Sequence, residues 1–348
     1  MGARPPGLGA GGGTVGLIAG GIITRYVGWE YIFYLNVPIG AAALVLAPRI
    51  VPDNRLSAVR RRFDLAGAIS GTAGLVLLVD ALSQAPQYGW GATRTIALLA
   101  ASVAVLAMFI VIESRVEDPV VPLSIFRLRT LAAANLAALL LGGSFFAFVF
   151  AGTLYMQQVL HYSALQTGAA WLAASVTSMS LAAVSQMLVT RVGAKVVMSI
   201  GMTLIGAGIA WATQAPVHGH FLADLAGPFV VAGAGTAFSF IPISVAALEG
   251  VTERQSGLAS GLLNTSTQFG AAIGTAIASS VLASGTNALL RAGDAAPTAL
   301  TGGFHRTFWV LAAIALIAPP ATFAVSRAGR RKAESESREA QRALPATN

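Results

Sequence analysis

Long apolar stretches separated by short polar segments recur along the whole chain of 348 residues. A membrane hydrocarbon core about 30 Å thick is crossed by roughly 20 apolar residues of α-helix, and we identify ten stretches of about this size. Their approximate spans are 7–24, 31–48, 65–85, 95–112, 131–156, 165–189, 196–213, 222–247, 257–284 and 307–325. The pattern predicts an all-α, polytopic membrane protein, a helical bundle of about ten transmembrane helices.

Composition supports a membrane protein over a soluble one. The chain is 55% hydrophobic and only 10% charged, with a mean hydropathy of +0.71. An ordinary soluble domain carries about 25% charged residues, so this chain lacks the polar residues that would cover a water-facing surface. It has no cysteine, which excludes disulfides, cysteine-ligated zinc and thiol catalysis.

The basic residues test the span assignment independently, because Lys and Arg accumulate on the cytoplasmic side of a membrane protein. When the connections alternate between two sides with the N-terminus inside, four basic residues fall outside: Arg25, Arg94, Arg291 and Arg306. The other 18 of the 22 Lys and Arg residues fall inside. This bias predicts that both termini are cytoplasmic. We expect the chain to lie in the plasma (inner) membrane.

The same bias accounts for the formal net charge of +8. Topology explains the excess of basic residues, and anionic lipid of the inner leaflet is the expected partner. We therefore expect no nucleic-acid partner.

No G-x-S-x-G, phosphate-binding loop or H-E-x-x-H pattern occurs, so the sequence predicts neither an enzyme nor a cofactor. The four histidines fall in outer connections, and "HGH" at 218–220 has no third ligand type nearby, so no metal site is expected.

"GGGTVGLIAGG", residues 11–21, is an uncharged run rich in glycine. Small residues allow the close backbone approach that drives helix association in lipid. Gly12, Gly16 and Gly20 are four residues apart and line one helix face, and Gly21 lies beside them. We predict a groove for another helix, either as a moving contact or as simple close packing.

A related pattern returns in "GLASGLLNTSTQFGAAIGTA". Gly257 and Gly261, then Gly270 and Gly274, repeat the four-residue interval. Transporters are often built from repeated halves whose corresponding helices carry corresponding features. The two glycine helices are eight spans apart, which fits six-helix halves only if two helices were inserted between them.

These residues carry a family resemblance. "GGGTVGLIAGG" followed by "GWEYIFYLNVPIG" resembles the fifth and sixth helices of the fourteen-helix drug:proton antiporters of the major facilitator superfamily, which have two extra helices between their halves. "LYMQQVLHYSALQTG" is similar to the end of the seventh core helix, and "GLASGLLNTSTQFGAAIG" to the eleventh. "RVGAK", with Arg191, Gly193 and Lys195, resembles the cytoplasmic loop between core helices eight and nine. The matches extend over essentially the whole chain.

The resemblance implies a secondary transporter that exports drugs or other lipophilic or cationic small molecules against protons. It implies residues 1–50 as the last two helices of the N-terminal half, 51–114 as a basic loop and two inserted helices, 115–326 as the C-terminal six-helix half and 327–348 as a disordered cytoplasmic tail. Counterparts of the family's first four helices are missing, so we expect an N-terminally truncated chain. The alternative function is a non-transporting membrane protein or fragment that needs those helices.

Departures from the family pattern bear on the fifth-helix motif. Leu17 stands where the family has a proline after glycine, and Trp29, Glu30 and Tyr31 replace the usual Trp-Arg-Trp. A proline-dependent bend in that helix is therefore not expected.

Polar side chains inside the spans are candidates for a substrate path, because hydrogen-bonding groups that face lipid would be unsatisfied. The amides are Asn135, Gln157, Gln158, Asn264 and Gln268, and Tyr155 and Trp171 add aromatic surface. Asn264 and Gln268 share one helix face. For the amides, lining a path and joining helices are equally favoured; for the aromatics, packing is favoured.

Asp80 is the one acidic residue well inside a span. A carboxylate in lipid is costly, so it is a candidate for proton coupling. The alternative is a side chain near the outer interface reached by water, which is favoured because the resemblance places Asp80 in an inserted, peripheral helix.

Overall fold

The structure is a computed structural model, and it describes residues 20, 23, 26–28, 30–50, 64–116, 125 and 128–343. Within these ranges the chain forms helices and no strands. The helices are α2 (Tyr31–Ile50), α3 (Leu65–Tyr88), α4 (Thr93–Glu113), α5 (Arg129–Leu141), α6 (Ala147–Gln158), α7 (Ala164–Val192), α8 (Ala194–Ala212), α9 (Ala226–Leu248), α10 (Glu253–Arg291) and α11 (Ala296–Ala343). The five-residue π-helices η2 (Gly142–Phe146) and η3 (Phe221–Leu225) join α5 to α6 and precede α9.

In the described part of the chain, eight helices are long and apolar enough to cross a membrane. They correspond to the expected spans from 65–85 onward, and α5, η2 and α6 together form one of them, Arg129–Gln158. The expected span 31–48 is helix α2, whose apolar part, Phe33–Leu46, is shorter. The expected span 7–24 falls almost entirely outside the described residues. The predicted all-α, polytopic architecture is confirmed.

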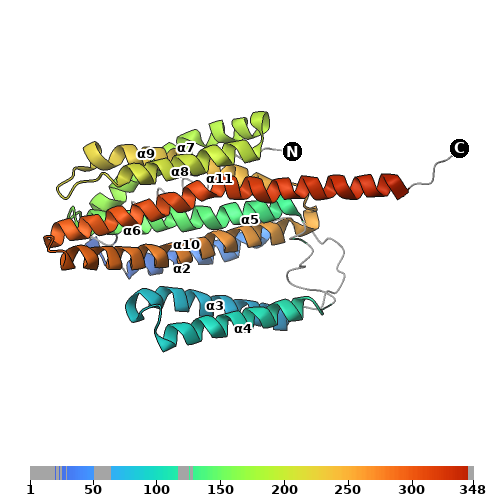
Figure 1. The fold of residues 1–348 in the computed structure, drawn as a ribbon, viewed down its shortest axis with the longest axis horizontal. Coiled ribbons are helices and arrows are strands. Elements are labelled where there is room, and N and C mark those ends of the chain that lie inside the picture. The colour runs from blue at the N-terminus through green and yellow to red at the C-terminus, as the bar shows by residue number, and fades with distance from the viewer. Residues whose placement is uncertain are drawn as a thin grey trace.

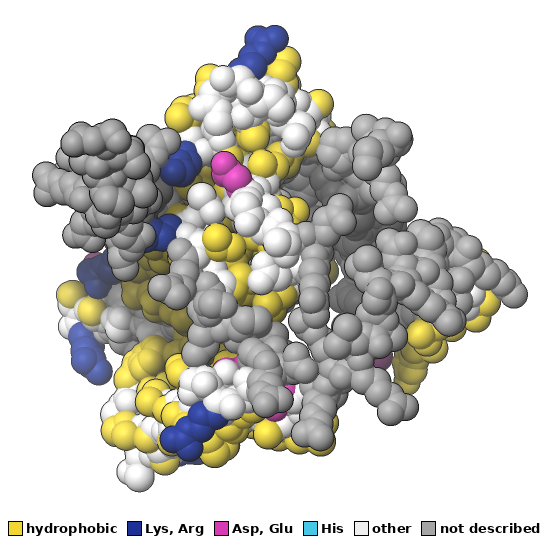
Figure 2. Space-filling model, turned by 90° about the vertical axis from the view of Figure 1, so that its right-hand side faces the viewer, with side chains coloured by type: hydrophobic (Ala, Val, Ile, Leu, Met, Phe, Trp, Pro, Cys, Tyr) yellow, Lys and Arg dark blue, Asp and Glu magenta, His cyan; other side chains and the backbone are white. Residues whose placement is uncertain are grey.

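The long helices lie roughly parallel to one another (Figure 1). Arg115, Arg129, Arg191 and Lys195 stand at or beside helix termini at one end of the bundle, which we call the basic end. Figure 2 looks onto this end and shows Lys and Arg side chains at several places around it. The opposite end, called the far end, holds the helix termini beside Arg94 and Arg291.

Large apolar side chains are exposed on the outside of the bundle. Among them are Val103 and Ile110 on α4, Met187 on α7 and Trp309 on α11. A soluble protein does not expose apolar surface on this scale, whereas a membrane protein presents it to lipid tails. Together with the long apolar helices, this surface makes the chain an integral membrane protein.

Helices α5 to α11 pack into one bundle with an aromatic core. The ring of Phe148 on α6 contacts the rings of Trp171, Phe229 and Phe308 edge to face, with centroids 5.5–5.7 Å apart. Trp171 stacks on Phe229 at 4.3 Å. Because lipid is itself apolar, such interlocking contacts, rather than the hydrophobic effect, hold membrane helices together.

Glycines allow α8 and α9 to approach closely. A Cβ atom at Gly235 would lie 2.6 Å from the backbone nitrogen of Ile205, and one at Gly208 would lie 2.8 Å from that of Ala232. These separations are shorter than any real Cβ contact, so both positions require glycine as the backbones stand.

Helices α3 and α4 form an antiparallel hairpin beside the main bundle (Figure 1). Ser102 on α4 donates a hydrogen bond of 2.9 Å to the carbonyl of Gly74 on α3. The hairpin contacts the bundle through α10, where the indole nitrogen of Trp90 donates a hydrogen bond of 2.8 Å to Ser280. This hairpin corresponds to the two helices that the resemblance identifies as an insertion.

Two helices are longer than expected. α10 covers Glu253–Arg291 against an expected 257–284, and α11 continues to Ala343. The expected disordered tail therefore begins within a helix. Residues 327–343 consist largely of Ala, Arg, Lys and Glu, which favour helix, and no proline interrupts them before Pro345.

Candidate functional site

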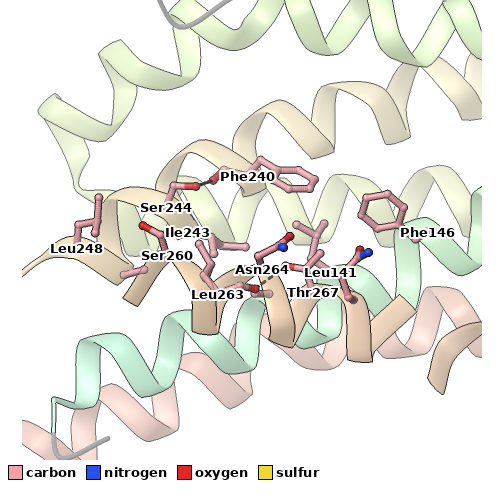
Figure 3. Close-up of a pocket in the computed structure, with 13 residues that line it drawn as sticks. Leu141, Phe146, Phe240, Ile243, Ser244, Leu248, Ser260, Leu263, Asn264 and Thr267 are labelled. Atoms are coloured by element: carbon pink, nitrogen blue, oxygen red, sulfur yellow. Dashed lines mark hydrogen bonds between the residues drawn. The ribbon is translucent and has the colours of Figure 1, made fainter. Parts of the chain in front are cut away.

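A pocket of about 330 Å³ lies among α5, η2, α9 and α10, and we call it the α5–α9–α10 pocket (Figure 3). Its lining combines apolar, hydroxyl, amide and aromatic side chains. The lining residues are Ala138, Leu141, Phe146, Phe240, Ile243, Ser244, Ala247, Leu248, Ser260, Leu263, Asn264, Thr267 and Gln268. This size lies at the lower end of the range for small-molecule sites.

Asn264 and Gln268 supply the amides of the pocket. They lie one turn apart on α10, and both side chains are exposed. The structure gives neither amide a hydrogen-bond partner within the described ranges, whereas the neighbouring hydroxyl of Thr267 donates to the carbonyl of Leu263 at 2.9 Å. Since both amides lie inside a membrane-spanning helix, they need water or a ligand in the pocket as a partner.

The aromatic side of the pocket comes from two other helices. Phe146 ends the π-helix η2, Phe240 lies on α9, and their rings meet edge to face with centroids 6.3 Å apart. A π-helix adds a residue to a helical turn, which rotates the side chains that follow relative to those before it. The π-helix therefore helps to set the direction of Phe146.

Beside the pocket, α5 and η2 cross α10 at the smallest separation that backbones allow. A Cβ atom at Gly142 would overlap the carbonyl oxygen of Thr267. One at Gly270 would overlap the carbonyl oxygen of Leu139, and one at Gly274 that of Gly143. Glycine from both helices brings the pocket wall together.

The other glycines of the expected packing set lie differently. Gly257 and Gly261 are exposed on α10, and a Cβ atom at either would meet none of the described residues within 4 Å. A Cβ atom at Gly20 would likewise meet none of the described residues within 4 Å. Gly12, Gly16 and Gly21 lie outside the described residues, so the packing role of these glycines stays a prediction.

Asn135 lies behind the pocket, buried between helices. Its side-chain nitrogen donates to the carbonyl of Leu131 at 2.9 Å, and its oxygen accepts a hydrogen bond of 2.8 Å from Ser266 on α10. Of the two open interpretations for this amide, this geometry favours the joining of helices.

The remaining path candidates lie away from the pocket. Tyr155 and Trp171 are buried in the core, where the Tyr155 hydroxyl donates to the carbonyl of Pro216 at 2.6 Å and the Trp171 indole to the hydroxyl of Thr153 at 3.0 Å. Gln157 and Gln158 are exposed at the far end of α6. The pocket thus brings together Asn264 and Gln268 and leaves the other candidates apart.

Asp80 lies on α3 of the hairpin and is partly buried. Its carboxylate accepts a hydrogen bond from the side-chain amide of Gln84, one turn along the same helix. The structure places it outside the lining of the α5–α9–α10 pocket.

Arg191, Gly193 and Lys195 form the tight connection between α7 and α8 at the basic end. Gly193 has φ +86° and ends α7, its amide donating to the carbonyl of Val189 at 3.0 Å. This left-handed conformation favours glycine. Arg191 and Lys195 flank the turn.

Sequence reasoning missed Phe146, Phe240, Ser244, Ser260 and Thr267. No local pattern distinguishes these side chains from other apolar or hydroxyl residues in the spans. The four-residue spacing found Asn264 and Gln268 because both lie on one helix, whereas the two phenylalanines meet only through the packing of different helices.

Comparison with known proteins agrees with the fold. The family profile described as Major Facilitator Superfamily matches residues 7–275 and, in a second alignment, residues 134–347. The cephamycin export protein CmcT of Amycolatopsis lactamdurans is 35% identical over 279 residues, which are 79% of this chain and 57% of that protein. The tetracenomycin C resistance and export protein of Streptomyces glaucescens is 32% identical over 285 residues, which are 82% of this chain and 52% of that protein.

The puromycin resistance protein pur8 of Streptomyces alboniger is 29% identical over 309 residues, or 88% of this chain and 61% of that protein. The chain thus spans between half and two thirds of the length of these relatives. The profile match and the identities agree with the resemblance found in the glycine-rich and amide-bearing helices. The chain belongs to the Major Facilitator Superfamily.

Proposed function

We propose that this chain is a secondary active exporter of small molecules, driven by a proton gradient, and that the α5–α9–α10 pocket is part of its substrate path. The observation that carries the proposal is a pair of amides, Asn264 and Gln268, that line a pocket inside the membrane-spanning bundle and have no hydrogen-bond partner among the described residues. The names of the relatives, which are export and resistance proteins, support efflux over the non-transporting alternative.

The proposed orientation places the basic end in the cytoplasm and the chain in the plasma (inner) membrane. Arg115, Arg129, Arg191 and Lys195 at that end support it through the preference of Lys and Arg for the cytoplasmic side. Both termini are then cytoplasmic. The substrate reaches the pocket from lipid or cytoplasm and leaves when one half of the bundle rocks against the other.

Coupling to protons needs an ionisable group that the transport cycle exposes to both sides. Asp80 is the candidate, because it is a partly buried carboxylate in a membrane-spanning helix. Its carboxylate accepts a hydrogen bond from the side-chain amide of Gln84, one turn along the same helix. Asp80→Asn should therefore abolish the response of efflux to the proton gradient while leaving substrate binding intact.

The function is tested by expressing this chain in bacteria that lack their own drug pumps and measuring accumulation of a fluorescent lipophilic dye. We expect less dye to accumulate than in cells without the chain. A protonophore should raise accumulation again, and Gln268→Ala should lose efflux. Gln186→Ala is the matched control, because Gln186 is exposed on α7 and does not line the pocket.

Unchanged dye accumulation in cells whose membranes contain the folded chain would overturn the proposal. It would support the alternative, a chain that needs further helices before it transports. Equal efflux by Gln268→Ala and the parent chain would remove the pocket from the path.

A further inference from the structure

We propose that the α5–α9–α10 pocket selects uncharged molecules that combine an aromatic ring with carbonyl, hydroxyl or amide groups, and that it excludes cations. This inference rests on the proposed function, since it names the substrate class of the same site. It narrows the lipophilic or cationic class that the sequence suggests.

Charge is the first argument. None of the described residues that line the pocket is ionisable, and their polar groups are hydroxyls and amides. A cation that enters loses its hydration and meets no counter-charge, which is among the largest costs in protein energetics. The faces of Phe146 and Phe240 return only part of that cost through cation–π attraction.

Hydrogen bonding is the second argument. The side-chain amides of Asn264 and Gln268 each offer two N–H donors and one carbonyl acceptor, and neither has a partner in the described ranges. A neutral ligand with a carbonyl or hydroxyl group satisfies them without bringing an unpaired charge into the membrane. A purely apolar ligand would leave both amides unsatisfied.

Aromatic surface is the third argument. The rings of Phe146 and Phe240 stand nearly perpendicular, at 82°, and more than a third of each side chain is exposed. By contrast, the rings of Phe148, Phe229, Phe304 and Phe308 are buried in the core. Two exposed rings beside unpartnered amides provide the edge and face contacts that an aromatic ligand needs.

The test is binding to the purified full chain in lipid nanodiscs, measured with two probes that differ in charge alone. One probe is a neutral coumarin carboxamide that carries a tert-butyl group, and the other is the same carboxamide with the isosteric trimethylammonium group in its place. We expect the neutral probe to bind at least about tenfold more tightly, because the cationic probe leaves an unpaired charge in the pocket. Equal or tighter binding of the cationic probe by the parent chain would overturn the inference.

A charge introduced into the pocket should reverse the preference. In Gln268→Glu we expect the cationic probe to gain about tenfold in affinity and the neutral probe to lose affinity. Gln186→Glu adds the same charge on α7, outside the pocket lining, and should change neither. If Gln268→Glu does not fold, Asn264→Asp provides the same test one turn away.

Binding separates this inference from the proposed function, because it does not require transport. If the chain binds the neutral probe but exports nothing, the inference stands and the proposed function is overturned. If the chain exports dye but binds neither probe, only the inference is overturned. The same holds if the chain exports dye and Gln268→Glu leaves the preference unchanged.

Discussion

Ser266 on α10 donates a hydrogen bond of 2.8 Å to the side-chain oxygen of Asn135 on α5, across 131 residues of sequence. Both residues are at least partly buried inside the bundle. The bond therefore joins two of the helices that form the pocket, close to the crossing at Gly142 and Gly270.

We expect Asn135→Ala to destabilise the bundle by about 1 kcal/mol, because the Ser266 hydroxyl loses its acceptor in a membrane interior. Ser266→Ala should cost a similar amount. The double variant should lose less stability than the two single variants lose in sum, because all three lose the same hydrogen bond. Thermal unfolding in detergent measures all of these changes, and strictly additive losses would contradict a direct link between the helices.

Gly270→Ala should lower the unfolding temperature although alanine favours helix. The added methyl group would overlap the carbonyl of Leu139, and overpacking of this kind costs about 1–3 kcal/mol, more than the helix-propensity gain of about 1 kcal/mol. Gly261→Ala on the same helix is the matched control. Its methyl group meets nothing within 4 Å, so it should leave stability unchanged or raise it. Equal effects at both positions would contradict the crossing geometry.

Tyr155→Phe should loosen the connection between α8 and η3 at the far end. The Tyr155 hydroxyl and the His305 ring hold successive carbonyls of that connection, Pro216 and Ala215. Loss of one bond costs about 1 kcal/mol and should raise hydrogen exchange at residues 217–220, as read by mass spectrometry. Tyr88→Phe, which removes a hydroxyl on α3, should leave exchange there unchanged.

Removal of residues 327–348 should lower the helical signal in far-UV circular dichroism in proportion to residues 327–343. The structure continues α11 through these residues, whereas a disordered tail would contribute no such signal. An unchanged signal per molecule would contradict the helix and support the disordered tail expected from composition.

The sequence predicts the helices well and their contacts less well. Hydrophobic length alone locates the eight spans, because a bilayer imposes that length on each. The shared face of Asn264 and Gln268 follows from helical periodicity and leads to the pocket. Periodicity cannot find Phe146, which the π-helix reorients, nor the partner of Asn135, because both depend on how separate helices pack.

The glycines of α10 show the same limit. Gly257 and Gly261 have the same spacing as Gly270 and Gly274, so the sequence treats both pairs alike. Among the described residues, a second helix crosses only the later pair. Spacing identifies a face that can accept a helix, and the tertiary arrangement decides which part of that face does so.

The most direct test of the account is thiol labelling inside the pocket, which is feasible because the chain has no cysteine of its own. Gln268→Cys places a single thiol in the pocket lining, and Gln186→Cys places one outside it. We predict that saturating neutral coumarin carboxamide slows maleimide labelling at position 268 by about tenfold and leaves position 186 unchanged. Labelling at position 268 that proceeds equally fast with and without the ligand would contradict a small-molecule path through the α5–α9–α10 pocket.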